Sequence, residues 1–278
     1  MKTTRRLLAA TLGLLASAQP SVVPAEEPDT TAATNETPSA EELAKLKQNP
    51  VSGLRQIVLQ ALVNPNTPGS GDTEASYSLQ PVFPFSLSED WKVITYSIVP
   101  VIELPGVNGK GDTVGLGDTL INLYVSPKKQ EGAFVWGIGP AILVPTRTNP
   151  ALGSDRWGLG PSGILFYAEG AWSAGVVLQN IWSLGGSGVN RIDEFAAQYI
   201  FNYNLPDGWF LYSNATITAD WQADQVDRWT VPIGGGLGRI FKIGKQPVSL
   251  SAQAFYNVVT PSNGPHLTVN VQFSFLFP

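Results

Sequence analysis

The chain has 278 residues, of which 43% are apolar and only 14% are charged, and it contains 28 glycines, 22 prolines and no cysteine. A typical soluble domain has about 25% charged residues, so this composition is unusual for a protein that faces water on all sides. The absence of cysteine excludes disulfide scaffolds and cysteine-based metal sites, and the single histidine disfavours a histidine-rich zinc site. The formal net charge of −5 disfavours a nucleic-acid partner.

The N-terminal 25 residues have the organisation of a secretory signal peptide. A basic start over residues 1–6 precedes the apolar segment Leu7–Ala18. This segment is the nearest the chain comes to the roughly 18 apolar residues of a spanning helix, which argues against a helical membrane protein. Cleavage after Ala18 and cleavage after Ala25 are both compatible with the small residues there, and the acidic residues that follow favour the second site. We therefore predict an exported protein.

Residues 26–50 are predicted to be a periplasmic linker with one short helix. Residues 26–38 are rich in Glu, Thr, Ala and Pro and lack the apolar side chains that a core requires. Ser39 and Glu42 then have the Ser-x-x-Glu spacing of a capping box, which predicts a helix over Ser39–Gln48. Asn49-Pro50 ends it, because the residue before a proline avoids the helical conformation.

From Leu54 onward the chain alternates with period two, as β-strands do. The last segment is the clearest, with Leu267, Val269 and Val271 on one face and Asn270 and Gln272 on the other. The polar faces of this and two further clear segments consist mainly of uncharged Ser, Thr, Asn and Gln. Such a face suits the lumen of a barrel better than a water-exposed sheet.

Twelve extended segments follow one another between residues 51 and 278. They span 54–62, 77–85, 91–102, 114–126, 134–146, 157–167, 172–184, 193–205, 209–222, 229–242, 248–258 and 266–277. Short turns and longer loops alternate between them, and both the even number and this alternation are typical of bacterial outer-membrane barrels. The sequence therefore predicts an all-β fold, a transmembrane antiparallel up-and-down barrel of about twelve strands, with both chain ends on the periplasmic, short-turn side.

The eight tryptophans are predicted to form an aromatic girdle. Trp91, Trp136, Trp172 and Trp209 fall near short turns, and Trp157, Trp182, Trp221 and Trp229 near long loops. Tryptophan prefers the membrane–water interface because its ring is apolar and its N–H requires a partner. A soluble β-sandwich, the alternative, would bury several of them at its centre.

Polar residues with lumen parity are the candidate site residues. They are Asp118, Gln198, Asn202, Asn214, Thr216, Asp220, Gln253, Asn270 and Gln272. The long loops and adjoining strand ends carry ten acidic residues against five basic ones, a surplus that attracts cations over a Debye length of roughly 8–10 Å. This pattern predicts a mild cation preference, or alternatively loop carboxylates that bind lipopolysaccharide through divalent ions.

The only histidine, His266, is the one candidate for a catalytic base. His266 shares its strand parity with Thr268 and Asn270, and a hydrolase needs a nucleophile, a histidine base and an orienting group. A single histidine at a strand start is more often a loop residue, so we predict no enzyme, no catalytic residue, no cofactor and no metal site.

Several motifs together resemble a known family. They are Asn49-Pro50-Val51, residues 80–85, Glu89-Asp90-Trp91, residues 115–118, the two Trp-Gly-x-Gly-Pro motifs at 136–140 and 157–161, residues 180–183, residues 244–250 and Leu276-Phe277-Pro278. The chain is similar over about residues 43–278 to the bacterial outer-membrane transporters grouped under the MetA pathway of phenol degradation, often mislabelled neuromedin U. This resemblance implies an outer-membrane β-barrel with a transport role, and it brings no known site residues.

Two functions from different classes remain open at this stage. The first is a transporter or narrow channel for a small-molecule solute, and the second is a structural or surface barrel whose lumen is filled. An outer-membrane lipid-modifying enzyme is the least favoured alternative. Outer-membrane lipid and lipopolysaccharide are the expected partners, and the sequence leaves the oligomeric state undetermined.

Overall fold

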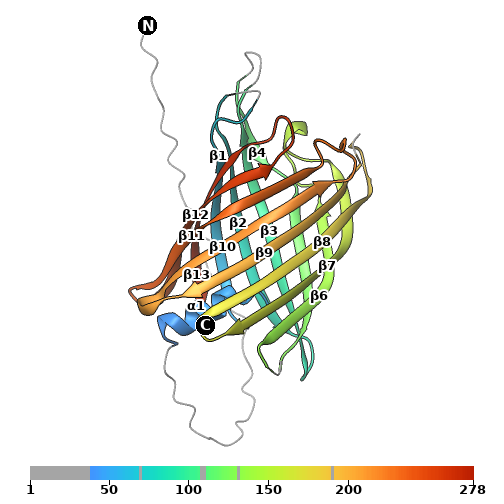
Figure 1. Cartoon of the computed structure of the whole chain (residues 1–278). Coiled ribbons are helices and arrows are strands. Elements are labelled where there is room, and N and C mark those ends of the chain that lie inside the picture. The colour runs from blue at the N-terminus through green and yellow to red at the C-terminus, as the bar shows by residue number, and fades with distance from the viewer. Residues whose placement is uncertain (1–37, 69–70, 107–110, 130–131, 189–190) are drawn as a thin grey trace, which may run out of the picture. The chain divides into compact units, whose positions relative to one another are not determined.

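The computed structural model describes residues 38–68, 71–106, 111–129, 132–188 and 191–278. Within these ranges the chain forms one α-helix, two single-turn 3-10 helices and a closed β-barrel (Figure 1). The predicted signal peptide, residues 1–25, and residues 26–37 of the predicted linker lie outside the described residues. No helix of the described part is long and apolar enough to cross a membrane.

The described residues form thirteen antiparallel strands. They are β1 (Arg55–Asn64), β2 (Glu74–Ser86), β3 (Trp91–Leu104), β4 (Thr113–Leu116), β5 (Thr119–Pro127), β6 (Phe134–Val144), β7 (Arg156–Glu169), β8 (Trp172–Gly186), β9 (Asp193–Asn204), β10 (Trp209–Asp220), β11 (Trp229–Ile243), β12 (Gln246–Val259) and β13 (Leu267–Phe277). Consecutive strands pair with each other except β4 and β5, and β1 also pairs with β13, which closes the barrel. Since β4 and β5 both pair with β3 and together make one crossing, the predicted twelve-stranded barrel is confirmed.

One predicted strand, 114–126, is interrupted where β4 ends and β5 begins. Val101 of β3 pairs with Leu116, whereas Ile98 pairs with Leu120, so that three residues of one strand oppose two of the other. This is a β-bulge. Pro100 lies opposite the interruption and has no N–H to donate to the ladder.

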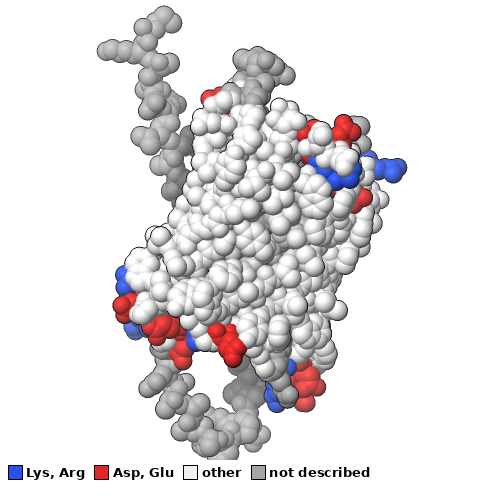
Figure 2. Space-filling model, viewed as in Figure 1, with Lys and Arg blue, Asp and Glu red and all other residues white. Residues whose placement is uncertain are grey.

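The two faces of each strand differ in chemistry, as the period-two pattern predicts. In β12, Ser249, Ser251 and Gln253 point into the barrel and are buried, while Leu250 and Tyr256 point outward and are exposed. Figure 2 shows the result on one side of the barrel, where charged side chains gather at the two ends and the middle is free of them. An uncharged outer band between two charged rims is what a bilayer requires of a barrel.

The connections alternate in length around the barrel. Those at 87–90, 128–133, 170–171, 205–208 and 244–245 have two to six residues and form the short-turn rim. Those at 65–73, 105–112, 145–155, 187–192, 221–228 and 260–266 have six to eleven residues and form the long-loop rim. That the long-loop rim faces the cell exterior stays a prediction.

The helix α1 (Ala40–Gln48) lies at the short-turn end of the barrel and packs against the inner face of its wall (Figure 1). The capping box is present, since the Ser39 hydroxyl accepts from the Glu42 amide and the Glu42 carboxylate accepts from the Ser39 amide. Leu43 and Ala44 are buried on the inner wall, packed with Leu54, Phe210, Tyr212, Ile240 and Leu276. The amphipathic helix therefore buries its apolar side against the barrel instead of extending away from it.

The segment after α1 crosses to the opposite wall. Val51 is 1% exposed and packs in a cluster with Val82, Ile94, Tyr124, Ile164, Phe166 and Ile200. Gln48 anchors the helix by exchanging two hydrogen bonds with the Asn204 side chain, at 2.8 and 3.1 Å. Together α1 and residues 49–54 form a floor across the short-turn end of the lumen.

Adjacent residues of β13 provide a stability test of the two faces. Val271 is 40% exposed on the outer face, and Gln272 lines the lumen. Val271→Arg should lower the free energy of unfolding in lipid vesicles by about 2–4 kcal/mol, because an arginine on the lipid face leaves water. Gln272→Arg, at nearly the same depth, should cost much less, because the lumen offers polar partners. Equal losses at the two positions would contradict the assignment of faces.

Candidate functional site

The lumen above the floor contains a cavity of about 630 Å³. This volume lies within the range of roughly 300–1,000 Å³ that small-molecule sites occupy. Its lining combines apolar side chains, such as Val58, Ile200 and Phe210, with uncharged polar ones, such as Gln80 and Asn202. Among the described lining residues, Lys47 of α1 alone carries a full charge. The cavity is thus amphipathic and almost neutral.

A second cavity of about 470 Å³ lies toward the long-loop rim. It shares Tyr96, Ile98 and Gln198 with the larger cavity, so the two are contiguous. Its charged lining residues are Glu194, near the start of β9, and Asp220, at the end of β10. The lumen therefore has an acidic end near the long loops and a single cation at the floor.

The nine candidate lumen residues occupy three kinds of position. Six line the larger cavity, namely Gln198, Asn202, Asn214, Thr216, Asn270 and Gln272. Asp220 lines the smaller cavity, together with Gln198 and Thr216. Gln253 and Asp118 are engaged in contacts with the backbone. That any of these side chains contacts a solute stays a prediction.

Gln253 completes the barrel wall from the inside. Its carboxamide oxygen accepts from the Asn214 amide at 3.2 Å, and its carboxamide nitrogen donates to the Asn214 carbonyl at 3.1 Å. Gly236 lies between them on β11, where a Cβ would come within 2.6 Å of the Gln253 side chain. The glutamine of β12 can therefore reach across β11 to β10 only because the intervening residue has no side chain.

This bridge lies where β10 and β11 do not pair. Their register runs over Trp209–Tyr212 and resumes at Thr218, leaving residues 213–217 without partners in β11. Ser213 donates to the Gly234 carbonyl at 2.6 Å, and the Tyr199 hydroxyl donates to the Pro232 carbonyl at 3.2 Å. Side chains thus satisfy backbone groups that an uninterrupted ladder would pair, as a membrane environment demands.

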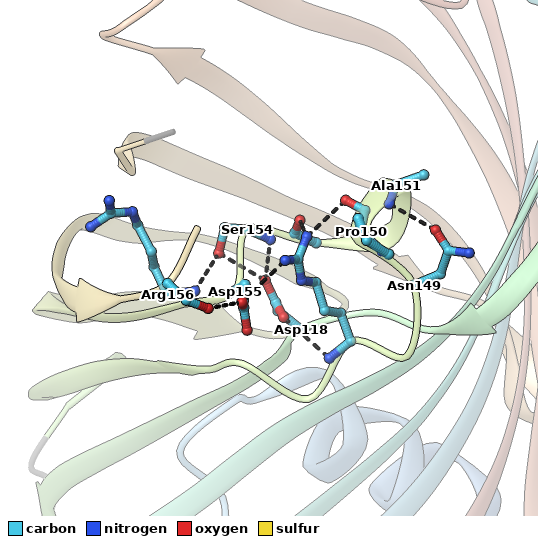
Figure 3. Close-up of polar contacts among 10 residues, drawn as sticks. Asp118, Asn149, Pro150, Ala151, Ser154, Asp155 and Arg156 are labelled. Carbon is cyan, nitrogen blue, oxygen red and sulfur yellow. Dashed lines mark hydrogen bonds and ion pairs between the residues drawn. The ribbon is translucent and has the colours of Figure 1, made fainter. Parts of the chain in front are cut away.

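Asp118 lies in the interruption between β4 and β5 and holds the loop 145–155 (Figure 3). Its carboxylate accepts from the Ser154 amide at 2.6 Å, from the Ser154 hydroxyl at 2.8 Å and from the Arg147 amide at 3.3 Å. A Cβ on Gly153 would lie 2.6 Å from this carboxylate, so glycine is required there. The period-two pattern predicts that Asp118 faces the lumen. It could not predict that the carboxylate accepts hydrogen bonds from the loop 145–155.

The loop 145–155 packs on the inner face of β4. Thr148 and Leu152 of the loop lie so close to Gly115 that a Cβ there would contact both. The neighbouring Gly117 lies against Pro100, which lines the larger cavity. Leu152 is 4% exposed. The loop therefore folds into the barrel mouth and narrows it.

Arg147 stabilises the same loop. Its guanidinium donates to the Pro150 and Gly153 carbonyls and forms an ion pair with Asp155 at 3.2 Å. The Ser187 hydroxyl and the Arg147 guanidinium hold the pKa of Asp155 below its usual value. Asp155, one of the ten acidic residues counted at this rim, and Asp118, which lies outside that count, are consequently both engaged in holding the loop.

Lys47 was not among the residues chosen from the sequence. Its Nζ lies 5.7 Å from the centre of the Phe210 ring, a cation–π contact, and it lines the larger cavity. Burial lowers the pKa of Lys47 from 10.5 to about 8. The only sequence signal was its spacing, four residues after the buried Leu43 on the same side of the helix.

His266 does not form a hydrolytic triad with Thr268 and Asn270. Its ring stacks on Tyr256, which is exposed on the outer face, with the ring centres 6.3 Å apart. Thr268 donates to the Asn64 side chain, and Asn270 accepts from Gln60. Each of the three side chains is thus occupied with a different partner.

The tryptophans lie at the positions expected for two girdles. Trp91 and Trp136 touch at the short-turn rim with ring centres 6.1 Å apart, and Trp221 and Trp229 touch at the long-loop rim at 5.6 Å. Seven of the eight are at least 38% exposed, and Trp229 is partly covered. That these rings contact the membrane interface stays a prediction.

Comparison with known proteins identifies the family. A family model described as "Putative MetA-pathway of phenol degradation" matches residues 51–274. The chain belongs to this family. The match covers the barrel except for the last three residues of β13, and it confirms the resemblance that the sequence motifs indicate. A search of curated proteins finds no match to the chain.

Solved structures share the architecture of this family member. The COG4313 outer membrane channel from Pseudomonas putida F1 is 18% identical, with a TM-score of 0.62 over 90% of this chain and 100% of that one. Outer membrane phospholipase A from Escherichia coli is 13% identical, with a TM-score of 0.46 over 86% and 98% of the two chains. The first likeness establishes the fold, and the second is too distant to inform function. With its uncharged outer band, the barrel is a protein of the bacterial outer membrane.

Removing the Asp118 carboxylate should loosen the mouth of the barrel. Asp118→Ala deletes the acceptor of three hydrogen bonds, and each bond to a charged group contributes about 1.5–3 kcal/mol. We expect amide hydrogen exchange across residues 147–155 to accelerate at least about tenfold, and single-channel conductance to rise. Asp224→Ala, which removes another carboxylate of the same rim, should leave both quantities unchanged. Unaltered exchange in Asp118→Ala would show that the loop is held by other contacts.

The pKa of Lys47 predicts a pH dependence of stability. Because the pKa in the folded state, about 8, is below the ordinary 10.5, the unfolded chain binds more protons between these values. The free energy of unfolding therefore rises with pH across this window, because Lys47 in the folded protein loses its proton, and with it its charge, at a lower pH than in the unfolded chain. Relative to Lys47→Met, the wild-type protein should gain about 1–3 kcal/mol of unfolding free energy between pH 7 and pH 10.5. The matched Lys45→Met variant should follow the wild type, and parallel curves for wild type and Lys47→Met would contradict the prediction.

Proposed function

We propose that this barrel is an outer-membrane channel for small amphipathic solutes. The observation that carries the proposal is the cavity of about 630 Å³ inside the membrane barrel, whose lining mixes apolar with uncharged polar side chains. A solute with an apolar body and one or two hydrogen-bonding groups would exchange water for such a lining at little cost. Large charged solutes would not.

The family supports solutes of the size of a single aromatic ring. Its description refers to a pathway of phenol degradation, and the solved structure with the higher TM-score is described as an outer membrane channel. A phenol-sized solute fits within the larger cavity by volume and could bind either polar or apolar lining groups. No catalytic step is part of this proposal, because the three side chains considered for hydrolysis have separate partners.

The floor determines how such a channel would work. Leu43 and Ala44 pack into the wall, and Gln48 is hydrogen-bonded to Asn204, so α1 obstructs the short-turn end. Passage through this end requires α1 to shift. The same obstruction favours the second function, a structural barrel with a filled lumen, and the two differ in whether the floor opens.

Conductance of the refolded mature protein in planar bilayers tests the proposal. Leu43 packs against the inner wall of the barrel and is 1% exposed, whereas Leu46 of the same helix is 37% exposed. Leu43→Asn should raise the open probability severalfold because it buries a polar group in the floor packing. Leu46→Asn should behave as the wild type. If neither the wild type nor Leu43→Asn conducts, the protein is a structural barrel and the channel proposal is wrong.

A further inference from the structure

Lys47 is the one charged side chain of the floor that lines the larger cavity. Within the described residues the one ion pair joins Arg147 and Asp155, so the Lys47 ammonium has no carboxylate partner there. Its recorded contact is with the face of Phe210, at 5.7 Å. The remaining described residues around the larger cavity are uncharged. The three N–H donors of this ammonium are therefore available to a molecule inside the cavity.

Keeping an ammonium there is unfavourable for folding. Burial lowers the pKa of Lys47 to about 8, which measures the preference of this position for the neutral form. A cation–π contact recovers only part of such a desolvation cost. A half-buried cation that lines a cavity and has no carboxylate partner is the kind of group that serves ligand binding.

The acidic end of the lumen does not neutralise Lys47. Phe210, which contacts the ammonium, and Asp220, which lines the smaller cavity, are ten residues apart on β10, or roughly 33 Å along the strand. Charges in a water-filled lumen are screened beyond a Debye length of about 8 Å. On the side of the floor that lines the larger cavity, Lys47 is therefore the one charge that an occupant meets.

We propose that the floor of the larger cavity is a binding site for small organic carboxylates, whose carboxylate accepts hydrogen bonds from Lys47 and whose apolar body lies against Phe210 and its neighbours. Ile200 and Tyr212 line the same cavity on β9 and β10, next to Asn202 and Phe210. This combination of one cation and an apolar wall selects a monoanion with a ring or short hydrocarbon body. The inference rests on the proposed function, since it names a solute class for that lumen.

The site also couples binding to the floor. Lys47 belongs to α1, next to Gln48, whose carboxamide is hydrogen-bonded to Asn204. A carboxylate on Lys47 therefore contacts the helix that obstructs the short-turn end. Lys47 therefore both contacts the solute and, as part of α1, belongs to the floor that must move.

Calorimetric titration of the refolded mature protein in a nonionic detergent tests the site. The probes are benzoate, its neutral isostere benzamide, and benzylamine as a cation, at pH 7. The wild type should bind benzoate at least about fivefold more tightly than benzamide and benzylamine, because a hydrogen bond to a charged group exceeds a neutral one by about that factor. Lys47→Gln should lose this preference by weakening benzoate at least fivefold while leaving benzamide within twofold.

Two further variants separate a charge effect from damage to the floor. Lys47→Arg keeps the cation and should retain the preference for benzoate, whereas Lys45→Gln removes an exposed lysine of the same helix and should change nothing. Benzoate that binds Lys47→Gln as well as the wild type, or binds the wild type no better than benzamide, overturns the site. Conductance is measured separately: a protein that conducts without this preference retains the channel function and loses only the carboxylate site, while a protein that binds benzoate but never conducts loses the channel function alone.

Discussion

The closed ladder of backbone hydrogen bonds is the constraint on which the rest of this structure depends. In a bilayer each unpaired N–H or C=O costs several kcal/mol, so a sheet can span it only when the first and last strands pair, as β1 and β13 do here. Closure gives every strand one face toward lipid and one toward the lumen. The uncharged outer band, the polar inner face and the crowding of charges at the rims all follow from that single requirement.

The places where this ladder is broken are also the places where side chains carry the most specific contacts. At the interruption between β4 and β5, Asp118 takes up three donors from the loop 145–155 and thereby narrows the mouth. Between β10 and β11, the carboxamide of Gln253 pairs with both backbone groups of Asn214. At each interruption a side chain replaces part of the missing backbone pairing.

The two ends of the lumen are closed in different ways. The mouth is narrowed by a polar, hydrogen-bonded loop, whereas the floor is built from an apolar helix face packed on Phe210 and Ile240. Of the two lysines of this helix, only Lys47 lines the larger cavity and so reaches its occupant. The surplus of loop carboxylates suggests a lumen that attracts cations, but the acidic lining residues belong to the smaller cavity near the long loops, and the larger cavity has only the cation of Lys47.

The sequence by itself determined the barrel, its twelve crossings, the facing of β13 and the capped helix after Ser39, since all of these arise from local periodicity and spacing. It could not determine that α1 folds back into the lumen, that Asp118 holds a loop 36 residues away at Ser154, or that Gln253 reaches across a glycine to β10. These contacts join residues that only closure of the sheet brings together. Period-two alternation predicts whether a side chain faces lipid or the lumen. It does not predict which residues that side chain contacts, because the diameter of the barrel and the path of its loops decide which residues come together.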